Sequence, residues 1–460
     1  MFEGPARLYQ VVSEATGRET DMKWRRGRQQ PRTRSPRVIV VGAGFAGLAA
    51  VAELARTDAQ VMLVDRNVYS TFQPLLYQVA TAGLNPGDIA YPVRSFTRRR
   101  GVRFRLGEVT DVDTRARRIR LADGGEYEYD YLVLATGVTT AYYGVTGAAE
   151  HTMGLYTRRD AISLRDHIMA WLERLDVDGP GRDINFTVVG GGATGVELAG
   201  ALAELRSTAL AAAFPEIDGR NVHIRLVEQL PVLLGPFHPA LQRYAYQQLV
   251  RRGVEVRLSA QIREVTPDQV LLAGGEDLPS DITVWAAGVA APPAIGQWGL
   301  PQGRGGRIRV GPDLAVAGQP GVFAAGDIAV ADGQPLPQLA PAAIQGGRHA
   351  ARQIRRLIAG RPTVPFGYRD KGIMATIGRR SAVVQLPARI RIRGTLAWLS
   401  WVGLHVVQLL GNRNRLSTLL NLAYRYVSWG HGAGMIVGDD PAAIEAAGPL
   451  QLTGAAPDRR

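Results

Sequence analysis

The sequence predicts an α/β fold built from two parallel β-sheets with helices on both faces. Short apolar runs alternate along the chain with segments of helix length, which is the pattern of β-α-β units. Two loops of the form Gly-x-Gly-x-x-Gly occur about 150 residues apart, each between a predicted strand and a predicted helix. With 460 residues the chain is long enough for two or three domains.

The composition narrows the chemistry. The chain contains no cysteine, which excludes disulfides, thiolate metal sites, iron–sulfur ligation and a redox-active dithiol. Any electron transfer must therefore use a bound organic cofactor, and we predict no metal site. No apolar run approaches the roughly 20 residues of a membrane-spanning helix. The N-terminus also lacks the apolar core of a signal peptide.

The net charge of +13 is unevenly placed. Residues 1–37 carry eight Arg and one Lys against four acids, and residues 371–438 carry eight Arg and one Lys with no acid. The rest of the chain is close to neutral, so the charge does not indicate a nucleic-acid partner. Residues 1–36 show no sustained period and are predicted to be a disordered basic tail.

The first loop connects a predicted strand at 37–41 to a predicted helix at 47–56. Its first glycine permits a tight turn, its second lets the backbone approach a pyrophosphate, and its third lets the helix pack on the strand. Asp65 follows the next strand, 60–64, where a carboxylate can bind a ribose hydroxyl. The alternative is a glycine-rich turn that binds nothing. The loop consists of Gly42, Ala43, Gly44, Phe45, Ala46 and Gly47.

The second loop follows a predicted strand at 185–189 and opens a predicted helix at 194–210. The next strand, 222–227, leads to Glu228, whose carboxylate can accept from a free ribose 2′-OH and repels a 2′-phosphate. This acid favours NADH over NADPH. Arg225 is nearby, but strand alternation turns it to the opposite face, so we expect the acid to decide the preference. The alternative for Glu228 is a solvated strand end. The loop consists of Gly190, Gly191, Gly192, Ala193, Thr194 and Gly195.

Two further strands end in small residues where a chain must pass close to a cofactor. The strand at 131–135 leads into Ala135, Thr136 and Gly137, and the strand at 322–325 leads into Gly326 and Asp327, an acid suited to a ribitol hydroxyl. Either could be a plain strand end, but their order after the loops is typical of flavoproteins. The remaining predicted strands are 254–258 and 282–285, and the remaining predicted helices are 160–175, 239–252 and 342–358.

These residues resemble the type II NADH dehydrogenases, the single-subunit NADH:quinone oxidoreductases, from about residue 37 to about residue 438. Beyond the loops, the resemblance is carried by the tracts 65–67, 72–81, 195–198, 326–329 and 368–372. It implies a two-domain flavoprotein like glutathione reductase with a C-terminal membrane-anchoring segment. The implied layout is a tail at 1–36, an FAD-binding domain at 37–157 and 288–387, an NADH-binding domain at 158–287, membrane-associating helices at 388–438 and a tail at 439–460.

The resemblance also implies a reaction. A hydride passes from NADH to a non-covalent FAD, two electrons then pass to a membrane quinone, and no proton is pumped. The resemblance implies catalytic roles for Glu197, Lys371 and Gln345. Lys371 is one of only two lysines in the sequence, the other being Lys23. The implied FAD contacts are the first loop except Ala43, with Asp65, Arg66, Gln73, Ala135, Thr136, Gly137, Gly326, Asp327, Leu339 and Ala340. The implied NADH contacts are the second loop with Glu228, Ala287 and Gly288.

The chain departs from the family pattern at the expected quinone site. The family has two Gln four residues apart, whereas here Pro341 replaces the first and Gln345 keeps the second. Proline suits the first turn of a helix but cannot donate a hydrogen bond to a quinone; Gln338 is a candidate substitute. A second departure is His431-Gly432-Ala433-Gly434, where the family usually has Arg-Gly-x-Arg.

The C-terminal segment predicts two apolar helices at 396–410 and 416–429, flanked by arginines and free of acids. Trp398, Trp401 and His405 fall on one face of the first helix. Such a pair suits one leaflet of an anionic membrane, reached from the cytoplasmic face. The alternative is a dimerisation or domain-capping helix, and His405 has no partner at metal-ligand spacing, so we expect it to be packed or interfacial.

Two rival functions remain open. One is a soluble NAD(P)H-dependent reductase of an electron-carrier protein, and the other is a non-enzymatic, flavin-bound redox sensor that has lost its acceptor site. Sulfide:quinone reductases and disulfide reductases are excluded by the absence of cysteine. The pairing of two copies into a homodimer also stays open.

Overall fold

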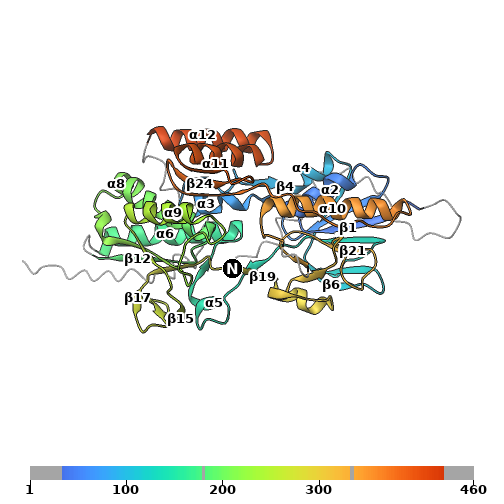
Figure 1. Ribbon diagram of the computed structural model, residues 1–460, viewed down its shortest axis with the longest axis horizontal. Coiled ribbons are helices and arrows are strands. Elements are labelled where there is room, and N and C mark those ends of the chain that lie inside the picture. Colours follow the sequence, from blue (N-terminus) through green and yellow to red (C-terminus); the bar gives the residue numbers. More distant parts are fainter. Residues whose placement is uncertain (1–33, 179–181, 332–335, 429–460) are drawn as a thin grey trace, which may run out of the picture. The chain divides into compact units, whose positions relative to one another are not determined.

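The computed structural model describes residues 34–178, 182–331 and 336–428. The chain divides into residues 1–35 and residues 36–460, and the second unit contains all the elements below. Its predicted α/β architecture is confirmed: two five-stranded sheets are covered by helices (Figure 1). The predicted tails at 1–33 and 429–460 lie outside the described residues. The predicted domain limits stay a prediction.

The first sheet is fully parallel and has the order β21-β9-β1-β2-β5. Helix α2 (Phe45–Leu54) begins directly after the first loop, and α10 (Ala340–Ile358) packs on it. A Cβ at Gly347 would lie 2.0 Å from the carbonyl oxygen of Ala46, so the two helices meet backbone to backbone. The strands are β1 (Arg37–Val41), β2 (Gln60–Asp65), β5 (Arg103–Leu106), β9 (Tyr131–Leu134) and β21 (Val322–Ala324).

The second sheet repeats this plan with the order β11-β18-β12-β13-β14. Helix α7 (Ala193–Glu204) begins directly after the second loop and continues as a π-helical turn over Leu205–Ala209. The strands are β11 (Met153–Gly154), β12 (Ile184–Val189), β13 (Val222–Val227), β14 (Val254–Arg257) and β18 (Ile282–Trp285). The covering helices are α6 (Arg158–Asp178), α8 (Leu210–Ala213) and α9 (Pro239–Arg251).

The internal repeat extends further than the two loops. Each half inserts a three-stranded antiparallel meander immediately before a strand that pairs with the first strand of its βαβ unit, β9 beside β1 and β18 beside β12; the sequence analysis missed both meanders. The first meander is β6 (Val109–Asp113), β7 (Arg118–Leu121) and β8 (Glu126–Glu128), and the second is β15 (Ile262–Val265), β16 (Gln269–Leu272) and β17 (Asp277–Pro279).

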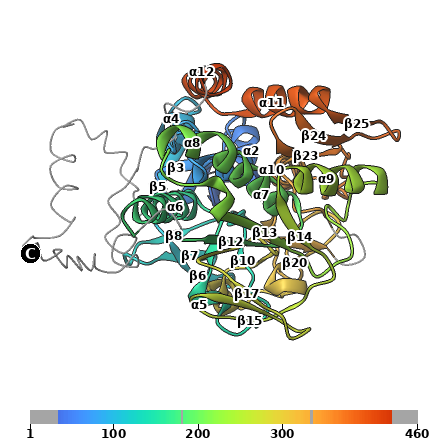
Figure 2. The ribbon, with the colours of Figure 1, turned by 90° about the vertical axis from the view of Figure 1, so that its left-hand side faces the viewer.

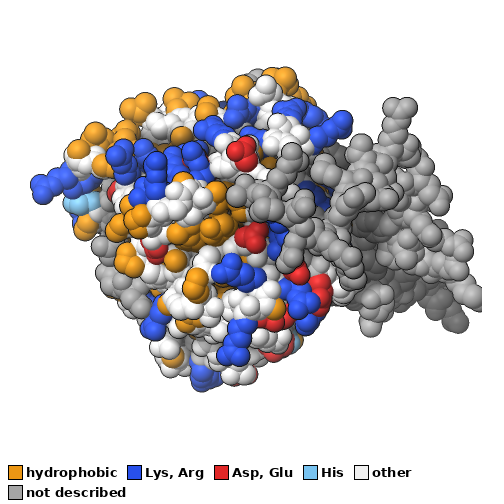
Figure 3. All heavy atoms as spheres, turned by 90° about the vertical axis from the view of Figure 1, so that its right-hand side faces the viewer, with side chains coloured by type: hydrophobic (Ala, Val, Ile, Leu, Met, Phe, Trp, Pro, Cys, Tyr) orange, Lys and Arg blue, Asp and Glu red, His pale blue; other side chains and the backbone are white. Residues whose placement is uncertain are grey.

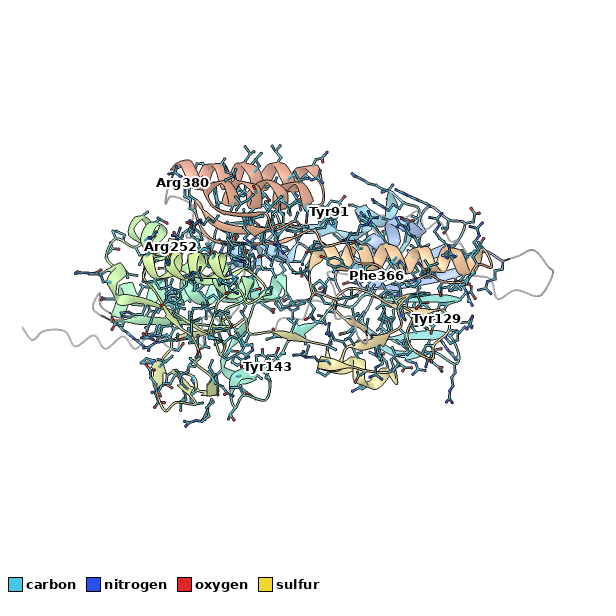
Figure 4. All side chains as sticks on the ribbon, in the orientation of Figure 1. Tyr91, Tyr129, Tyr143, Arg252, Phe366 and Arg380 are labelled. Carbon is cyan, nitrogen blue, oxygen red and sulfur yellow. The ribbon has the colours of Figure 1, made fainter. Side chains whose placement is uncertain are left out.

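Another antiparallel sheet packs against the first C-terminal helix, α11 (Figure 2). Its antiparallel strands are β23 (Ile373–Gly378), β24 (Ser381–Gln385) and β25 (Arg391–Gly394). Helices α11 (Thr395–Gln408) and α12 (Asn412–Ser428) follow. The second predicted helix therefore begins four residues earlier than expected, directly after Gly411, which has a φ of 83° and packs on the ring of Tyr91 (Figure 4).

Helix α12 is hydrogen-bonded to Asp88 and Ala90 in the first half of the chain. The Asp88 carboxylate accepts hydrogen bonds from Ser417 Oγ at 2.6 Å and Asn421 Nδ2 at 2.5 Å, and Asn414 Nδ2 donates to the Ala90 carbonyl. Trp401, Leu409 and Leu422 are buried in the same core as α7.

The smaller elements are β3 (Tyr69–Thr71), β4 (Ala90–Pro92), β10 (Thr139–Thr140), β19 (Val289–Ala290), β20 (Ile308–Val310), β22 (Ala329–Ala331), α3 (Leu76–Ala80), α4 (Val93–Arg98), α5 (Ala148–His151) and short 3₁₀ turns at Gln73–Leu75, Gly219–Asn221, Pro293–Trp298 and Arg304–Gly306.

Candidate functional site

The first glycine loop is tightly closed and leaves open space at one position. A Cβ at Gly42 would lie 2.2 Å from the Ala135 carbonyl oxygen, and a Cβ at Gly47 would lie 1.8 Å from the carbonyl oxygen of Gly42. A Cβ at Gly44 would meet no atom within 4 Å. The loop therefore needs glycine at its two ends for packing, and its middle glycine faces a space that a pyrophosphate can fill.

Asp65 lies beside this loop, as its spacing predicted. Its Oδ2 accepts from the backbone N–H of Ala43 at 2.6 Å, and its Oδ1 accepts from the N–H of Asn67 at 2.7 Å. Burial raises the pKa of this carboxyl, although both hydrogen bonds oppose the shift. Arg66 instead turns outward and reaches Glu108 at 3.5 Å, and Gln73 begins the 3₁₀ turn before α3.

The other predicted cofactor residues of this half gather at the same sheet edge. The Ala325 N–H donates to the Leu134 carbonyl, so the ends of β21 and β9 lie side by side. Thr136 Oγ1 is buried without a hydrogen-bond partner among the described residues. Burial raises the pKa of Asp327 to about 6, against the opposing charge of Arg307. A buried hydroxyl and carboxyl at a carboxyl edge fit a polar ligand.

Helix α10 begins at this edge. A Cβ at Gly326 would lie 3.0 Å from the Ala46 Cβ and 3.6 Å from the Ala343 Cβ. Leu339 stands at the N-cap without a side-chain cap, Ala340 is the first helical residue, and Pro341 falls in the first turn as predicted. The unpaired N–H groups of this turn favour negative charge nearby.

The second loop repeats the geometry of the first. A Cβ at Gly195 would lie 1.8 Å from the Gly190 carbonyl oxygen, and one at Gly192 would meet no atom within 4 Å. Glu228 Oε2 accepts from the Gly191 N–H at 2.5 Å, just as Asp65 accepts from Ala43. Each loop is therefore tied, at the same position, to the acid that ends the next strand.

The surroundings of the second loop also match the expectation. Arg225 bonds Glu255 at 2.9 Å and so faces away from the loop. Ala287 and Gly288 follow β18, and a Cβ at Gly190 would lie 2.7 Å from the Ala287 Cα. Gly288 packs on the hydroxyl of Tyr143 (Figure 4). Gly192, Ala193 and Thr194 are exposed at the start of α7, where a second nucleotide can approach.

Both helix starts fit a dinucleotide. Neither α2 nor α7 has a side-chain cap or an acid in its first turn, and each starts beside the glycine that faces open space. Uncapped N–H groups and the positive end of the helix dipole favour a phosphate at each. The chain thus has two matched helix starts that can each accept a phosphate, in sheets that repeat one plan.

Glu197 lies deep in the protein on the first turns of α7. Its Oε1 accepts from the Thr376 backbone N–H of β23 at 3.2 Å. Burial raises the pKa of Glu197 to about 8, although this hydrogen bond opposes the shift. At pH 7 most of this carboxyl is therefore protonated, unlike an ordinary glutamate.

A chain of rings leads from the first loop to α11. Phe45 meets Phe72 edge to face at 5.8 Å, Phe72 meets His405 at 6.0 Å, and His405 stacks on Trp401 with centroids 4.0 Å apart. Burial lowers the pKa of His405 to about 4, so this packed histidine is neutral. The helical spacing of positions 401 and 405 signals their contact.

Gln345 and Lys371 lie near the same turn: Gln345 is hydrogen-bonded to its backbone, whereas the Lys371 side chain is exposed. The Gln345 amide donates to the Arg369 carbonyl at 3.0 Å and accepts from the Arg369 N–H at 3.0 Å, so it holds the turn that contains Lys371. Lys371 is exposed at the end of this turn, and Gln338 is exposed ahead of α10. The sequence analysis did not predict that the Gln345 amide is hydrogen-bonded to the Arg369 backbone. The expected contact of Gln345 with a quinone stays a prediction.

Comparison with known proteins identifies the family. Residues 36–347 match the pyridine nucleotide-disulphide oxidoreductase family. The chain is 39% identical over 404 residues to the type II NADH:quinone oxidoreductase NdhA of Mycobacterium tuberculosis, covering 83% of this chain and 85% of the relative. The chain belongs to the type II NADH:quinone oxidoreductase family.

A second relative agrees with this membership, and a solved structure shares the fold. The type II NADH:quinone oxidoreductase Ndh of Mycobacterium tuberculosis is 35% identical over 427 residues, covering 88% of this chain and 91% of the relative. The solved structure of NDH2 from Plasmodium falciparum in complex with NADH has the same fold, with a TM-score of 0.80 at 18% identity over 88% of this chain and all of that one. The predicted resemblance to type II NADH dehydrogenases is thus confirmed.

Proposed function

We propose that this type II NADH:quinone oxidoreductase family member oxidises NADH with a non-covalent FAD and passes two electrons to a membrane quinone without pumping protons. The paired glycine loops, each bonded to the acid of the next strand, are the observation that carries this proposal. They provide for two dinucleotides at once, as a hydride relay needs.

The first half of the chain supplies the residues to hold FAD. The N–H groups at the start of α2 would bind its pyrophosphate, Asp65 a ribose hydroxyl, and Asp327 its ribitol. When bound, the flavin accepts a hydride and releases electrons to the quinone. The start of α7 would bind the NADH pyrophosphate, and Glu228 would accept from the 2′-OH of its adenosine ribose.

Proton balance gives Glu197 a role. The overall reaction converts NADH, a proton and a quinone into NAD⁺ and a quinol, so one proton must come from outside the hydride. The Glu197 carboxyl is buried and mostly protonated at neutral pH. Since its pKa lies near the working pH, it can hold that proton and release it during quinone reduction.

Helices α11 and α12 would place the protein on the membrane. Their outer sides expose Leu396, Leu399, Val407, Leu416, Leu419, Leu420 and Tyr424. Figures 1 and 2 place α4 on the same side, and α4 together with the two residues that follow it exposes four arginines, Arg94, Arg98, Arg99 and Arg100. Figure 3 shows Lys and Arg side chains gathered along the upper part of one face. Apolar helices beside basic side chains suit an anionic leaflet.

This placement is peripheral and cytoplasmic in our proposal. Among the described residues, no helix combines the length and hydropathy that crossing a bilayer requires. A lipid-soluble acceptor could then reach the Glu197 region along α11 without leaving the bilayer. Whether two copies of the chain pair into a homodimer stays open.

The visible spectrum of the purified protein tests the proposal. We expect a flavin spectrum that bleaches on anaerobic addition of NADH and returns on addition of a quinone. A colourless protein that takes up no FAD would refute the flavoenzyme. Reoxidation by a carrier protein but not by quinone would favour the soluble reductase, and bleaching without any reoxidation would favour the redox sensor.

The substitution Glu228→Ala tests nucleotide choice. Its carboxylate would accept from the 2′-OH of NADH and repel the 2′-phosphate of NADPH, so its removal should narrow the NADH-over-NADPH ratio of kcat/KM by about tenfold. Glu276→Ala, an exposed acid of the same half that pairs with Arg257, serves as the control. An unchanged ratio in Glu228→Ala would exclude the ribose contact.

Lys371→Ala tests the acceptor side. We expect quinone-dependent turnover to fall by about tenfold while flavin reduction by NADH stays within about twofold, because an exposed ammonium near Gln345 would act on the acceptor. Lys371→Arg keeps the charge and changes its shape, so it separates the two contributions. Equal loss in both half-reactions would show that Lys371 has another role.

A further inference from the structure

One tyrosine of the second half of the chain reaches the sheet edge where the first half is proposed to hold FAD. Tyr156 lies between β11 of the second sheet and α6. The backbone N–H groups of Tyr156 and Thr157 both donate to Asp160 Oδ2, at 3.0 and 2.8 Å. Its neighbour Leu155 is buried in the same core as α7. The backbone of Tyr156 is therefore fixed in the half that carries the second loop.

The hydroxyl of Tyr156 lies at the end of β9, in the first half. The Val138 N–H donates to this hydroxyl at 3.5 Å, and a Cβ at Gly137 would lie 3.3 Å from it. Gly137 has a φ of 70° and directly follows Ala135 and Thr136, which are expected to contact FAD. A side chain anchored in one half thus reaches the proposed cofactor edge of the other half.

The order of the strands indicates which part of FAD would lie there. Along this edge β2, β1, β9 and β21 follow one another. Asp65, which would bind the adenosine ribose, ends β2, and the first loop, which would bind the pyrophosphate, follows β1. A dinucleotide that crosses the edge in this direction brings its flavin part to the ends of β9 and β21. The Tyr156 hydroxyl is therefore on the flavin side of the pyrophosphate.

Three polar groups at this end of the edge have unused hydrogen-bonding capacity. Thr136 Oγ1 is buried without a partner, and the Asp327 carboxylate accepts no hydrogen bond, both among the described residues. The Tyr156 hydroxyl accepts from Val138, but its own proton meets no acceptor in the described part of the chain. Burial raises the pKa of this phenol, so it stays protonated at neutral pH and can donate. Polar groups in such places are normally hydrogen-bonded, so this cluster fits a ligand that carries oxygens.

We propose that Tyr156 is a further FAD ligand: its hydroxyl donates a hydrogen bond to an oxygen of the flavin part, on the ring or the ribitol, so that the NADH-binding half of the chain helps to hold the flavin. The proposal rests on the function proposed above. The competing role is a ring that packs between the two halves without touching the cofactor. Removal of the hydroxyl alone separates the two roles.

Tyr156→Phe removes the hydroxyl and keeps the ring. We expect the dissociation constant of FAD to rise by about tenfold, the usual effect of one lost hydrogen bond on binding. The fluorescence of flavin released when the holoenzyme is diluted measures this constant. A dissociation constant that stays within about twofold of the wild-type value would overturn the proposal.

The midpoint potential of the bound flavin distinguishes the two oxygens. A donor to a ring oxygen stabilises the reduced ring, which carries more negative charge, so its loss should lower the midpoint potential. A donor to the ribitol would change the affinity and leave the midpoint potential in place. Either result, together with the weaker binding, supports a contact with the flavin part.

Tyr129→Phe is the matched control (Figure 4). Tyr129 is 1% exposed and precedes β9 at the end away from the proposed cofactor edge, and its hydroxyl has no hydrogen-bond partner among the described residues. This variant loses the same atom from the same half and should leave the dissociation constant of FAD unchanged. An equal rise in both variants would indicate a general loosening of the first half and would overturn the proposal.

Tyr156→Ala tests the competing role. If the ring only packs between the halves, Tyr156→Phe binds FAD like the wild type and Tyr156→Ala binds it weakly, and that pattern would overturn the proposal. A wild-type protein that takes up no FAD would instead refute the proposed function. A wild-type protein that binds FAD as tightly as Tyr156→Phe does would leave that function standing and overturn only the role of Tyr156.

Discussion

Gly195→Ala is expected to abolish NADH oxidation while leaving the flavin bound. Its new Cβ would lie 1.8 Å from the carbonyl oxygen of Gly190, so the second loop would have to open. Opening separates the N–H groups of α7 from the pyrophosphate and breaks the hydrogen bond between Gly191 and Glu228. We expect kcat/KM for NADH to fall by at least about 100-fold. Stopped-flow flavin reduction measures the loss, and the visible spectrum measures retained flavin.

Two other glycines make this experiment specific. Gly192→Ala places its Cβ where no protein atom lies within 4 Å, so this variant should fold normally. It should weaken the binding of NADH only because the new methyl group lies where the nucleotide is expected. Gly47→Ala creates the same 1.8 Å clash in the first loop and should give a colourless protein. Loss of flavin from Gly195→Ala, or of NADH oxidation from Gly47→Ala with its flavin retained, would contradict the assignment of one cofactor to each loop.

The sequence was informative wherever local chemistry decides structure. Glycine spacing and apolar runs located both glycine loops, and the spacing to Asp65 and Glu228 placed each acid beside its loop, because consecutive parallel strands end at one edge. The meanders were missed because strands such as Val109–Asp113 are short and break the alternation of a strand, with two polar residues between Val109 and Val112. A weak period of this kind does not separate a strand from a loop.

The site was less predictable where distant segments meet. The hydrogen bond from the Thr376 N–H to Glu197 joins β23 to α7, and the two bonds between Gln345 and Arg369 join α10 to a loop. Neither pair has a local signature, because side chains brought together by tertiary packing carry no common spacing. Family resemblance pointed to Glu197, whereas only the folded chain shows what surrounds it.

The structure also changes how the membrane segment should be tested. Deleting the chain after about Arg389 would remove Trp401, Leu409 and Leu422, which are at most 4% exposed and belong to the main core. Such a deletion would expose apolar surface, so loss of membrane binding would be confounded with unfolding. Substitutions confined to the outer face avoid this effect.

Leu399→Glu combined with Leu420→Glu is therefore expected to lower the affinity of the protein for anionic vesicles by about 100-fold. Each change removes a half-exposed leucine and adds a charge that the lipid repels. Co-sedimentation with vesicles at low salt measures binding. NADH oxidation with a water-soluble acceptor should persist, since neither side chain is buried.

Val250→Glu combined with Ile358→Glu is the matched control, because these residues are 46% and 40% exposed on α9 and α10. It adds the same charge to helices outside the α11–α12 pair and should leave sedimentation nearly unchanged. Equal release by both double variants would mean that net charge alone controls binding. Release by neither would mean that α11 and α12 cover another protein surface, the dimerisation or capping role that the sequence left open.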